Sequence, residues 1–178
     1  MRVIHLKERS GQTRCNQVAF QKAQGEYIIR MDGDLQDNPK DLRYFFEVLP
    51  QKPDIIMGLR AMRRHRRLLR IATMLYDAMM VALFDTPFYT NSSSFIAYRA
   101  KYVQNITFKR NDHRYLPIIA IHRGASNLHE VVVANRDRKY GKTKYGYYSK
   151  FVKGIPEVLR FLFRLKRGYY PNNVPNKD

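Results

Sequence analysis

The residues best suited to chemistry lie in one short segment, Tyr27 to Pro39. Its opening apolar run ends in two carboxylates, Asp32 and Asp34, separated only by Gly33. Alternate residues of an extended chain point the same way, so both carboxylates can converge where a strand ends. With the amide oxygen of Gln36 nearby, the segment offers hard oxygen donors. Such donors suit Mg²⁺ or Mn²⁺, ions usually shared with the phosphates of a substrate.

The same Asp-Gly-Asp tripeptide also has the composition of a solvated turn, because aspartate and glycine are ordinary turn residues. Two features of the surrounding chain favour a ligand site instead. An apolar run precedes the acids, and the segment from Leu35 to Pro39 closes the turn with a proline. In open α/β sheets, ligands bind at the carboxyl ends of strands, which is where these acids would lie.

The elements around the acids alternate between strand and helix patterns. We expect strands at Val3–Leu6, Tyr27–Met31 and Asp54–Gly58, with helices at Gly11–Gln24 and after Pro39. This order predicts an α/β fold with a mostly parallel sheet. Further along, the pattern predicts these elements: a long apolar helix over Leu68–Phe84, strands at Phe95–Tyr98 and Leu128–Ala134, helical segments at Lys101–Ile106 and Tyr115–His122, and a basic apolar helix over Phe151–Arg167.

Composition limits the class of protein. The chain has 178 residues, 44% of them hydrophobic, which is enough for one domain with a core. No uninterrupted apolar run approaches the roughly 20 residues needed to span a bilayer, and the lone Cys15 fits a reducing compartment. The net charge of +18 implies an anionic partner, whether nucleic acid, an anionic membrane or a phosphorylated substrate.

Four motifs follow one another along the chain, at Arg9–Gln12, Ala23–Glu26, Met31–Pro39 and Arg138–Tyr145. In this order they resemble the motifs of family 2 glycosyltransferases of the polyprenyl-phosphate type, and the resemblance runs from about Val3 to Tyr148. It implies a GT-A type, Rossmann-like, mostly parallel sheet flanked by helices, without the first strand and helix of the family. The implied domains are a partial GT-A domain over residues 1–148, an amphipathic basic helix over 149–168 that could lie in a membrane interface, and a disordered tail over 169–178.

The resemblance also implies roles for individual residues. Asp34 and Arg138 would be catalytic, and Asp32, Asp34 and Gln36 would hold Mg²⁺ or Mn²⁺. Binding of the nucleotide-sugar and its phosphates would fall to Arg9, Arg60, Arg70, Thr73, Arg138 and Lys144, and acceptor binding to Arg60, Arg138 and Tyr145. The sequence departs from the family pattern at Leu69, where the family has arginine, at Thr90, where it has aspartate, and at Ser94, where it has glycine.

The implied function is metal-dependent, inverting transfer of a sugar from a nucleotide-sugar to a polyprenyl phosphate. It would take place at the cytoplasmic face of a membrane, with peripheral contact to anionic lipid and no nucleic-acid partner. One alternative is a family 2 transferase with a polysaccharide hydroxyl acceptor, which would need a carboxylate base. By resemblance the acceptor would lie near His113–Pro117, and Asp112 is the only acid near that segment. A catalytically inactive fragment and a basic nucleic-acid-binding domain also stay open, although no nucleic-acid motif is present.

Overall fold

A computed structural model describes residues 3–60, 67–87, 93–134 and 147–172, without the side chains of 67–73, 76, 77 and 147–153. Its centre is a four-stranded sheet in the order β1-β3-β2-β4. The strands are β1 (Tyr27–Arg30), β2 (Ile55–Arg60), β3 (Ile96–Arg99) and β4 (Leu128–Val133). β3 runs antiparallel to both of its neighbours, whereas β2 and β4 are parallel. Three strands therefore share one direction, and β3 lies reversed between β1 and β2.

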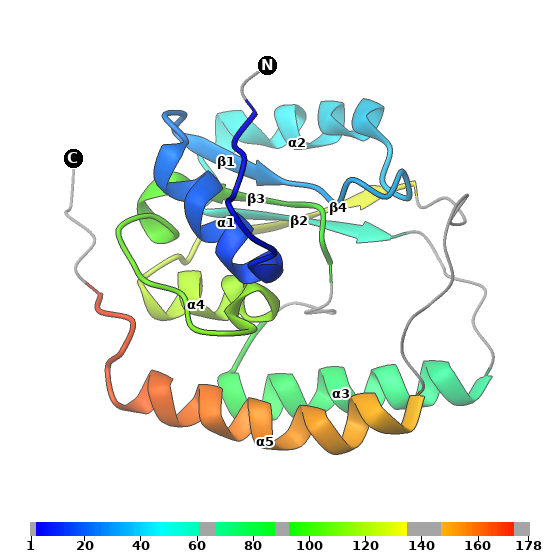
Figure 1. Ribbon diagram of the computed structural model, residues 1–178. Coiled ribbons are helices and arrows are strands. Elements are labelled where there is room, and N and C mark those ends of the chain that lie inside the picture. The colour runs from blue at the N-terminus through cyan, green and yellow to red at the C-terminus, as the bar shows by residue number, and fades with distance from the viewer. Residues whose placement is uncertain (1–2, 61–66, 88–92, 135–146, 173–178) are drawn as a thin grey trace.

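Helices cover both faces of this sheet (Figure 1). α2 (Leu42–Val48) follows a short 3-10 turn at Pro39–Asp41 and lies over one face. On the other face lie α1 (Gly11–Lys22) and α4 (Leu116–His122). Beyond them, α3 (Arg67–Phe84) and α5 (Tyr147–Lys166) run side by side along the outer surface of the molecule. The remaining 3-10 turns are Leu49–Gln51, Ala100–Tyr102 and Asp112–Arg114.

The core has two parts, one on each face of the sheet, because successive side chains of a strand point to opposite faces. Ile56 of β2 packs with Phe45 of α2, and the rings of Phe45 and Phe95 stack at 4.6 Å. The neighbouring Ile55 and Met57 point to the opposite face, which holds the larger cluster contributed by α1, α3, α4 and α5. Because each face of β2 meets a different helical layer, the whole run Ile55–Met57 is apolar and buried rather than alternating.

Two expectations about the sheet need correction. The expected strand at Val3–Leu6 does not form: these residues belong to no strand, and Val3 and Ile4 are 61% and 49% exposed, because no neighbouring strand in the described part of the chain pairs with them. The sheet is also mixed rather than mostly parallel in its pairings, since β3 is inserted in reverse between β1 and β2.

The C-terminal segment corrects a third expectation. The sequence predicts a disordered tail from residue 169, but Tyr170 is fully buried and its hydroxyl donates a 2.7 Å hydrogen bond to Asp112. The carbonyl of Pro171 accepts a hydrogen bond from Arg123. The buried ring of Tyr170 and the hydrogen bond from the buried Arg123 together hold the chain that follows α5 against the domain. Residues 173–178, the rest of that tail, lie outside the described residues.

Candidate active site

The acidic segment follows β1 at one edge of the sheet. Ile28 is 7% exposed and anchors the strand in the core, and the strand ends at Arg30, two residues before Asp32. The loop then turns back through Leu35, whose φ of 64° lies in the left-handed region although it is not a glycine. Such a conformation costs on the order of 1–2 kcal/mol, and strain of this kind clusters at ligand sites.

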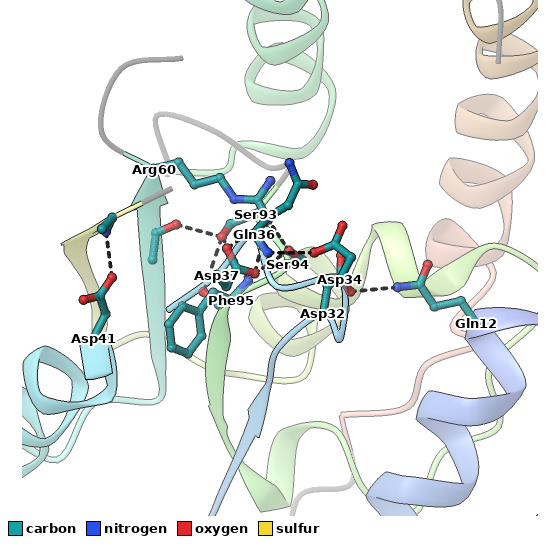
Figure 2. A network of polar contacts seen from close by, with 12 residues as sticks. Gln12, Asp32, Asp34, Gln36, Asp37, Asp41, Arg60, Ser93, Ser94 and Phe95 are labelled. Carbon is teal, nitrogen blue, oxygen red and sulfur yellow. Dashed lines mark hydrogen bonds and ion pairs between the residues drawn. The ribbon is translucent and has the colours of Figure 1, made fainter. Parts of the chain in front are cut away.

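Asp32 and Asp34 are both half-buried and lie toward α1 in Figure 2. Asp32 Oδ1 accepts a 3.3 Å hydrogen bond from Nε2 of Gln12, the second residue of α1. Asp34 Oδ1 accepts a 3.2 Å hydrogen bond from the backbone N–H of Gln36. These bonds are long for N–H···O contacts, whose usual length is about 2.9–3.0 Å. The two carboxylates are thus oriented by α1 and by their own turn.

The third carboxylate of the loop, Asp37, has a different environment. Its side chain is fully buried and lies between Arg60, the last residue of β2, and Ser94, just before β3 (Figure 2). Arg60 Nη2 lies 3.1 Å and 3.2 Å from the two carboxylate oxygens. Ser93, next in the chain to this cluster, donates a 2.7 Å hydrogen bond to the carbonyl of Gly58. This cluster ties the acidic loop to two strands.

A second polar network joins α1 and β1 to the turn at Asp112–Arg114. The hydroxyl of Thr13 lies 2.7 Å from Nδ1 of His113 and accepts a hydrogen bond from the backbone N–H of Asn111. Arg30 donates to the carbonyl of His113 at 2.9 Å. Burial and the nearby Arg114 and Arg30 lower the pKa of His113 to about 4. His113 is therefore neutral at pH 7, and the tautomer of its ring sets which partner donates in the hydrogen bond with the Thr13 hydroxyl.

The neighbouring Asp112 is fully buried and accepts hydrogen bonds from three directions. Lys109 N–H and Arg164 Nη2 each lie at 2.6 Å, and the Tyr170 hydroxyl lies at 2.7 Å. Burial raises the pKa of Asp112, and these donors lower it in part. A carboxylate enclosed in this way cannot reach a substrate hydroxyl, which argues against the base role that the polysaccharide alternative requires.

The residues expected to form the site fall into three groups. Asp32, Asp34 and Gln36 lie together in the loop after β1, and Arg60 lies beside that loop through Asp37. Arg9 lies two residues before α1 and is exposed. The remaining candidates lie where side chains are not described: Arg70 and Thr73 within α3, and Arg138, Lys144 and Tyr145 between β4 and α5.

Sequence reasoning missed three residues of this site, namely Gln12, Asp37 and Ser94. Gln12 and Asp37 lie inside the motif segments Arg9–Gln12 and Met31–Pro39, but the sequence assigns no chemistry to them. Ser94 stands out in the sequence only as a departure from the expected glycine. The position of each side chain relative to Asp32 or Arg60 depends on pairing between segments far apart in sequence, which a single segment does not reveal.

The donor set fits a hard divalent cation. Asp32 and Asp34 are half-buried carboxylates in one short loop, and Gln36, a residue with an amide oxygen, belongs to the same turn. In the part of the chain that the structure describes, no group of three or more histidine, cysteine, aspartate or glutamate side chains could enclose a metal ion. Two carboxylates completed by substrate phosphates are the usual arrangement for Mg²⁺.

Two acids thus follow β1 beside helix α1, in an α/β sheet that helices cover on both faces, and comparison with known proteins places this arrangement in a family. Residues 1–107 match the family model described as glycosyl transferase family 2. The chain therefore belongs to glycosyl transferase family 2, and the predicted membership is confirmed.

Two curated relatives are polyprenyl-phosphate sugar transferases by name. Dodecaprenyl-phosphate galacturonate synthase of Rhizobium johnstonii is 27% identical over 169 residues, covering 93% of this chain and 50% of the relative. Undecaprenyl-phosphate 4-deoxy-4-formamido-L-arabinose transferase of Photorhabdus laumondii is 25% identical over 159 residues, covering 89% of this chain and 48% of the relative. The chain thus spans about half the length of the curated relatives it matches.

Solved structures of glucosyl-3-phosphoglycerate synthase from Mycobacterium tuberculosis share the fold. The complex with phosphoglyceric acid superposes with a TM-score of 0.65 at 14% identity, covering 90% of this chain and 56% of that one. The complex with Mn²⁺ and UDP-glucose gives a TM-score of 0.64 at 13% identity, covering 88% and 56%. The predicted α/β fold of GT-A type is confirmed, with a mixed sheet of four strands.

Proposed function

We propose that this chain carries the catalytic site of a metal-dependent, inverting glycosyltransferase that moves a sugar from a nucleotide-sugar to a polyprenyl phosphate. The observation that carries the proposal is the orientation of Asp32 and Asp34 at the carboxyl end of β1 in a family 2 chain. The names of the curated relatives support the class of acceptor, and the Mn²⁺ and UDP-glucose of a structural relative support the class of donor.

The chain's own residues supply orientation and charge. Asp32, Asp34 and Gln36 would hold Mg²⁺ or Mn²⁺, which neutralises charge on the departing nucleoside diphosphate. An acceptor phosphate oxygen attacks the anomeric carbon from the face opposite the leaving group. The new carbon–oxygen bond forms as the bond to the diphosphate breaks, so the configuration inverts. A phosphate, whose second pKa is about 6, is already ionised at neutral pH and needs no general base. Arg60 and, by resemblance, Arg138 would contribute positive charge.

Binding of donor nucleotide tests the metal site without requiring turnover. We expect Mn²⁺ and a nucleoside diphosphate, offered as a panel that includes UDP, to raise the thermal midpoint together. At a ligand concentration of about 100 times Kd, the gain in unfolding free energy is about 2.7 kcal/mol. Asp34→Asn should lose this gain, and Glu47→Gln, an exposed acid on α2, should keep it. A folded wild-type chain without any metal-dependent gain would contradict the proposal.

We further propose that the acceptor is met at a membrane surface, through the face formed by α3 and α5. Seven of the thirteen exposed large apolar side chains in the described part of the chain lie on these two helices: Met74, Leu75, Val81 and Leu83 on α3, and Ile155, Leu159 and Phe163 on α5. The inner side of α5 packs on the core through Val158 and Phe161, so α5 is both a packed helix and an exposed one.

The charged side chains on α5 and just after it indicate which kind of membrane surface this face fits. Arg160, Lys166 and Arg167 are exposed beside the apolar stripe, and the guanidinium of Arg167 lies 4.0 Å from the centre of the Phe163 ring. The acid of the described part of α5, Glu157, pairs with Arg114. An apolar stripe flanked by cations suits the interface of an anionic bilayer. Among the described residues, no helix has the length and hydropathy to cross a bilayer.

Vesicle flotation tests this placement. We expect the chain to float with vesicles that contain phosphatidylglycerol and to remain unbound with neutral phosphatidylcholine vesicles. The double variant Leu159→Ser/Phe163→Ser should lose flotation. Val132→Ser is the matched control, because Val132 is 64% exposed but lies on β4. If the double variant floats as well as the wild type, the face of α3 and α5 is not the docking surface. Salt-sensitive binding of RNA or DNA, without any metal effect, would instead support the nucleic-acid alternative.

A further inference from the structure

The guanidinium of Arg60 is held by two residues rather than one. Its Nη2 donates a 2.5 Å hydrogen bond to Ser94 Oγ and lies 3.1 Å and 3.2 Å from the carboxylate oxygens of Asp37. Ser94 Oγ in turn donates to Asp37 Oδ2 at 3.2 Å. The three side chains close a triangle between the acidic loop, the end of β2 and the segment that leads into β3 (Figure 2).

The ion pair within this triangle is incompletely bonded. Asp37 Oδ1 is buried and accepts no hydrogen bond from the described part of the chain, although Arg60 Nη2 is near it. Arg60 Nε is also buried and donates none among the described residues. Asp37 therefore attracts the guanidinium without fixing its plane through two parallel bonds, the arrangement that orients arginine best. The short bond to Ser94 is the contact that sets the orientation.

Burial makes that orientation persistent. The Asp37 side chain is fully buried, the Arg60 side chain is 13% exposed and Ser94 is 6% exposed. Arg60 is the last residue of β2 and lies beside the loop that holds Asp32 and Asp34, with a small part of its side chain exposed. A cation fixed before the ligand arrives loses less side-chain entropy on binding than a free one.

We propose that Ser94 is a positioning residue, whose hydroxyl holds the Arg60 guanidinium in the orientation that receives the phosphate of the acceptor. This inference rests on the proposed transfer to a phosphate acceptor. The glycine expected at this position has no side chain to bridge Arg60 and Asp37, so the departure from the family pattern has a physical consequence. Ser94 itself does not contact the reacting atoms; it acts through Arg60.

Titration with a short water-soluble prenyl phosphate, such as geranyl phosphate, tests this role. Isothermal calorimetry would measure its Kd in the presence of Mn²⁺ and the nucleoside diphosphate that gives the largest thermal gain. Ser94→Ala and Ser94→Gly should each raise Kd about tenfold, the effect expected from losing one hydrogen bond to a charged group. The affinity for Mn²⁺ and nucleotide should stay unchanged. Ser94→Thr, which keeps the hydroxyl, should restore the Kd of the wild type to within about threefold.

Ser93→Ala is the matched control. Ser93 is 8% exposed and its hydroxyl bonds to the backbone at Gly58 and Phe95, so its loss should lower the thermal midpoint and leave the prenyl phosphate Kd unchanged. The inference is overturned if Ser94→Ala and Ser94→Gly bind as the wild type does, or if Ser93→Ala weakens binding equally. Failure of the proposed function has a different outcome: the folded wild type then binds neither nucleotide with metal nor prenyl phosphate.

Discussion

The acidic loop after β1 and the cluster around Asp112 both hold carboxylates, but their hydrogen bonds differ in length and in origin. Asp112 accepts bonds of 2.6–2.7 Å from its own turn, from α5 and from the segment after α5. Gln12 and Gln36 reach Asp32 and Asp34 at 3.3 Å and 3.2 Å. Asp112 is fully buried, whereas Asp32 and Asp34 are half-buried.

This difference supports the proposed distinction between a carboxylate that stabilises the fold and carboxylates that bind a ligand. Short bonds from several elements compensate for removing a charge from water. A long bond such as that from Gln12 to Asp32 fixes a direction, and a divalent cation can supply further charge compensation. Asp37 resembles Asp112 in that its side chain is fully buried. It differs in that one of its oxygens accepts no hydrogen bond from the described residues.

The largest effect should come from removing the structural carboxylate. We expect Asp112→Ala to lower the free energy of unfolding by about 4 kcal/mol, because it leaves Arg164 without its buried partner. Urea denaturation followed by circular dichroism measures this loss. If the variant is as stable as the wild type, the two carboxylate centres do not differ in the way proposed.

The next largest effect concerns the pH dependence of His113, which lies beside Asp112. Its pKa is about 4 in the fold, against 6.5 in the unfolded chain, because of burial and then Arg114 and Arg30. Between these values the unfolded state binds more protons, so the stability contribution is complete above pH 6.5 and is lost as the pH falls toward 4. The loss should reach up to about 3 kcal/mol.

Urea titrations at several pH values measure this slope, with His113→Gln as the control that cannot titrate. Burial raises the pKa of Asp112 and therefore acts in the opposite direction, since its contribution falls as the pH rises above the usual range of an aspartate. The difference between wild type and His113→Gln isolates the histidine. Equal slopes for the two proteins would show that the fold leaves the pKa of His113 at its ordinary value, which would contradict the prediction.

A smaller change should follow from removing one of the three donors to Asp112. Tyr170→Phe keeps the buried ring against Phe161 and loses the hydroxyl that donates to Asp112. We expect a loss of about 1 kcal/mol in unfolding free energy, the usual contribution of one hydrogen bond. A loss as large as that of Asp112→Ala would mean that the C-terminal segment, rather than the carboxylate, carries the stability of this cluster.

The smallest effect on stability is expected in the acidic loop. Asp32→Asn should change the free energy of unfolding by no more than about 0.5 kcal/mol, because its contact with Gln12 is long and exposed. The same variant should lose the Mn²⁺-dependent gain in thermal midpoint. A stability loss of several kcal/mol would place Asp32 with the structural carboxylates and would weaken the case for a metal site.

Much of the architecture was predictable because it depends on local patterns. The helix predicted at Leu68–Phe84 is α3 (Arg67–Phe84), and the strand predicted before Asp32 is β1. The failures share one cause. Val3–Leu6 has the composition of a strand but no neighbour to pair with in the described structure, and Tyr170 lies in a polar tail yet bonds to a residue more than fifty positions earlier in the chain. Pairing partners of this kind are not visible in a local window.

The sequence by itself determined the chemistry that this protein can offer: two carboxylates at alternate positions after an apolar run, a strongly cationic chain, and the motifs of a sugar transferase family. The tertiary structure alone decided which of the carboxylates are enclosed by hydrogen-bond donors and which are half-buried. It enclosed Asp112 between α5 and the segment after it, joined Asp37 to Arg60 and Ser94, and left Asp32 and Asp34 half-buried. The reason is that burial and hydrogen bonding arise where distant segments meet, and they determine whether a carboxylate stabilises the fold or binds a ligand.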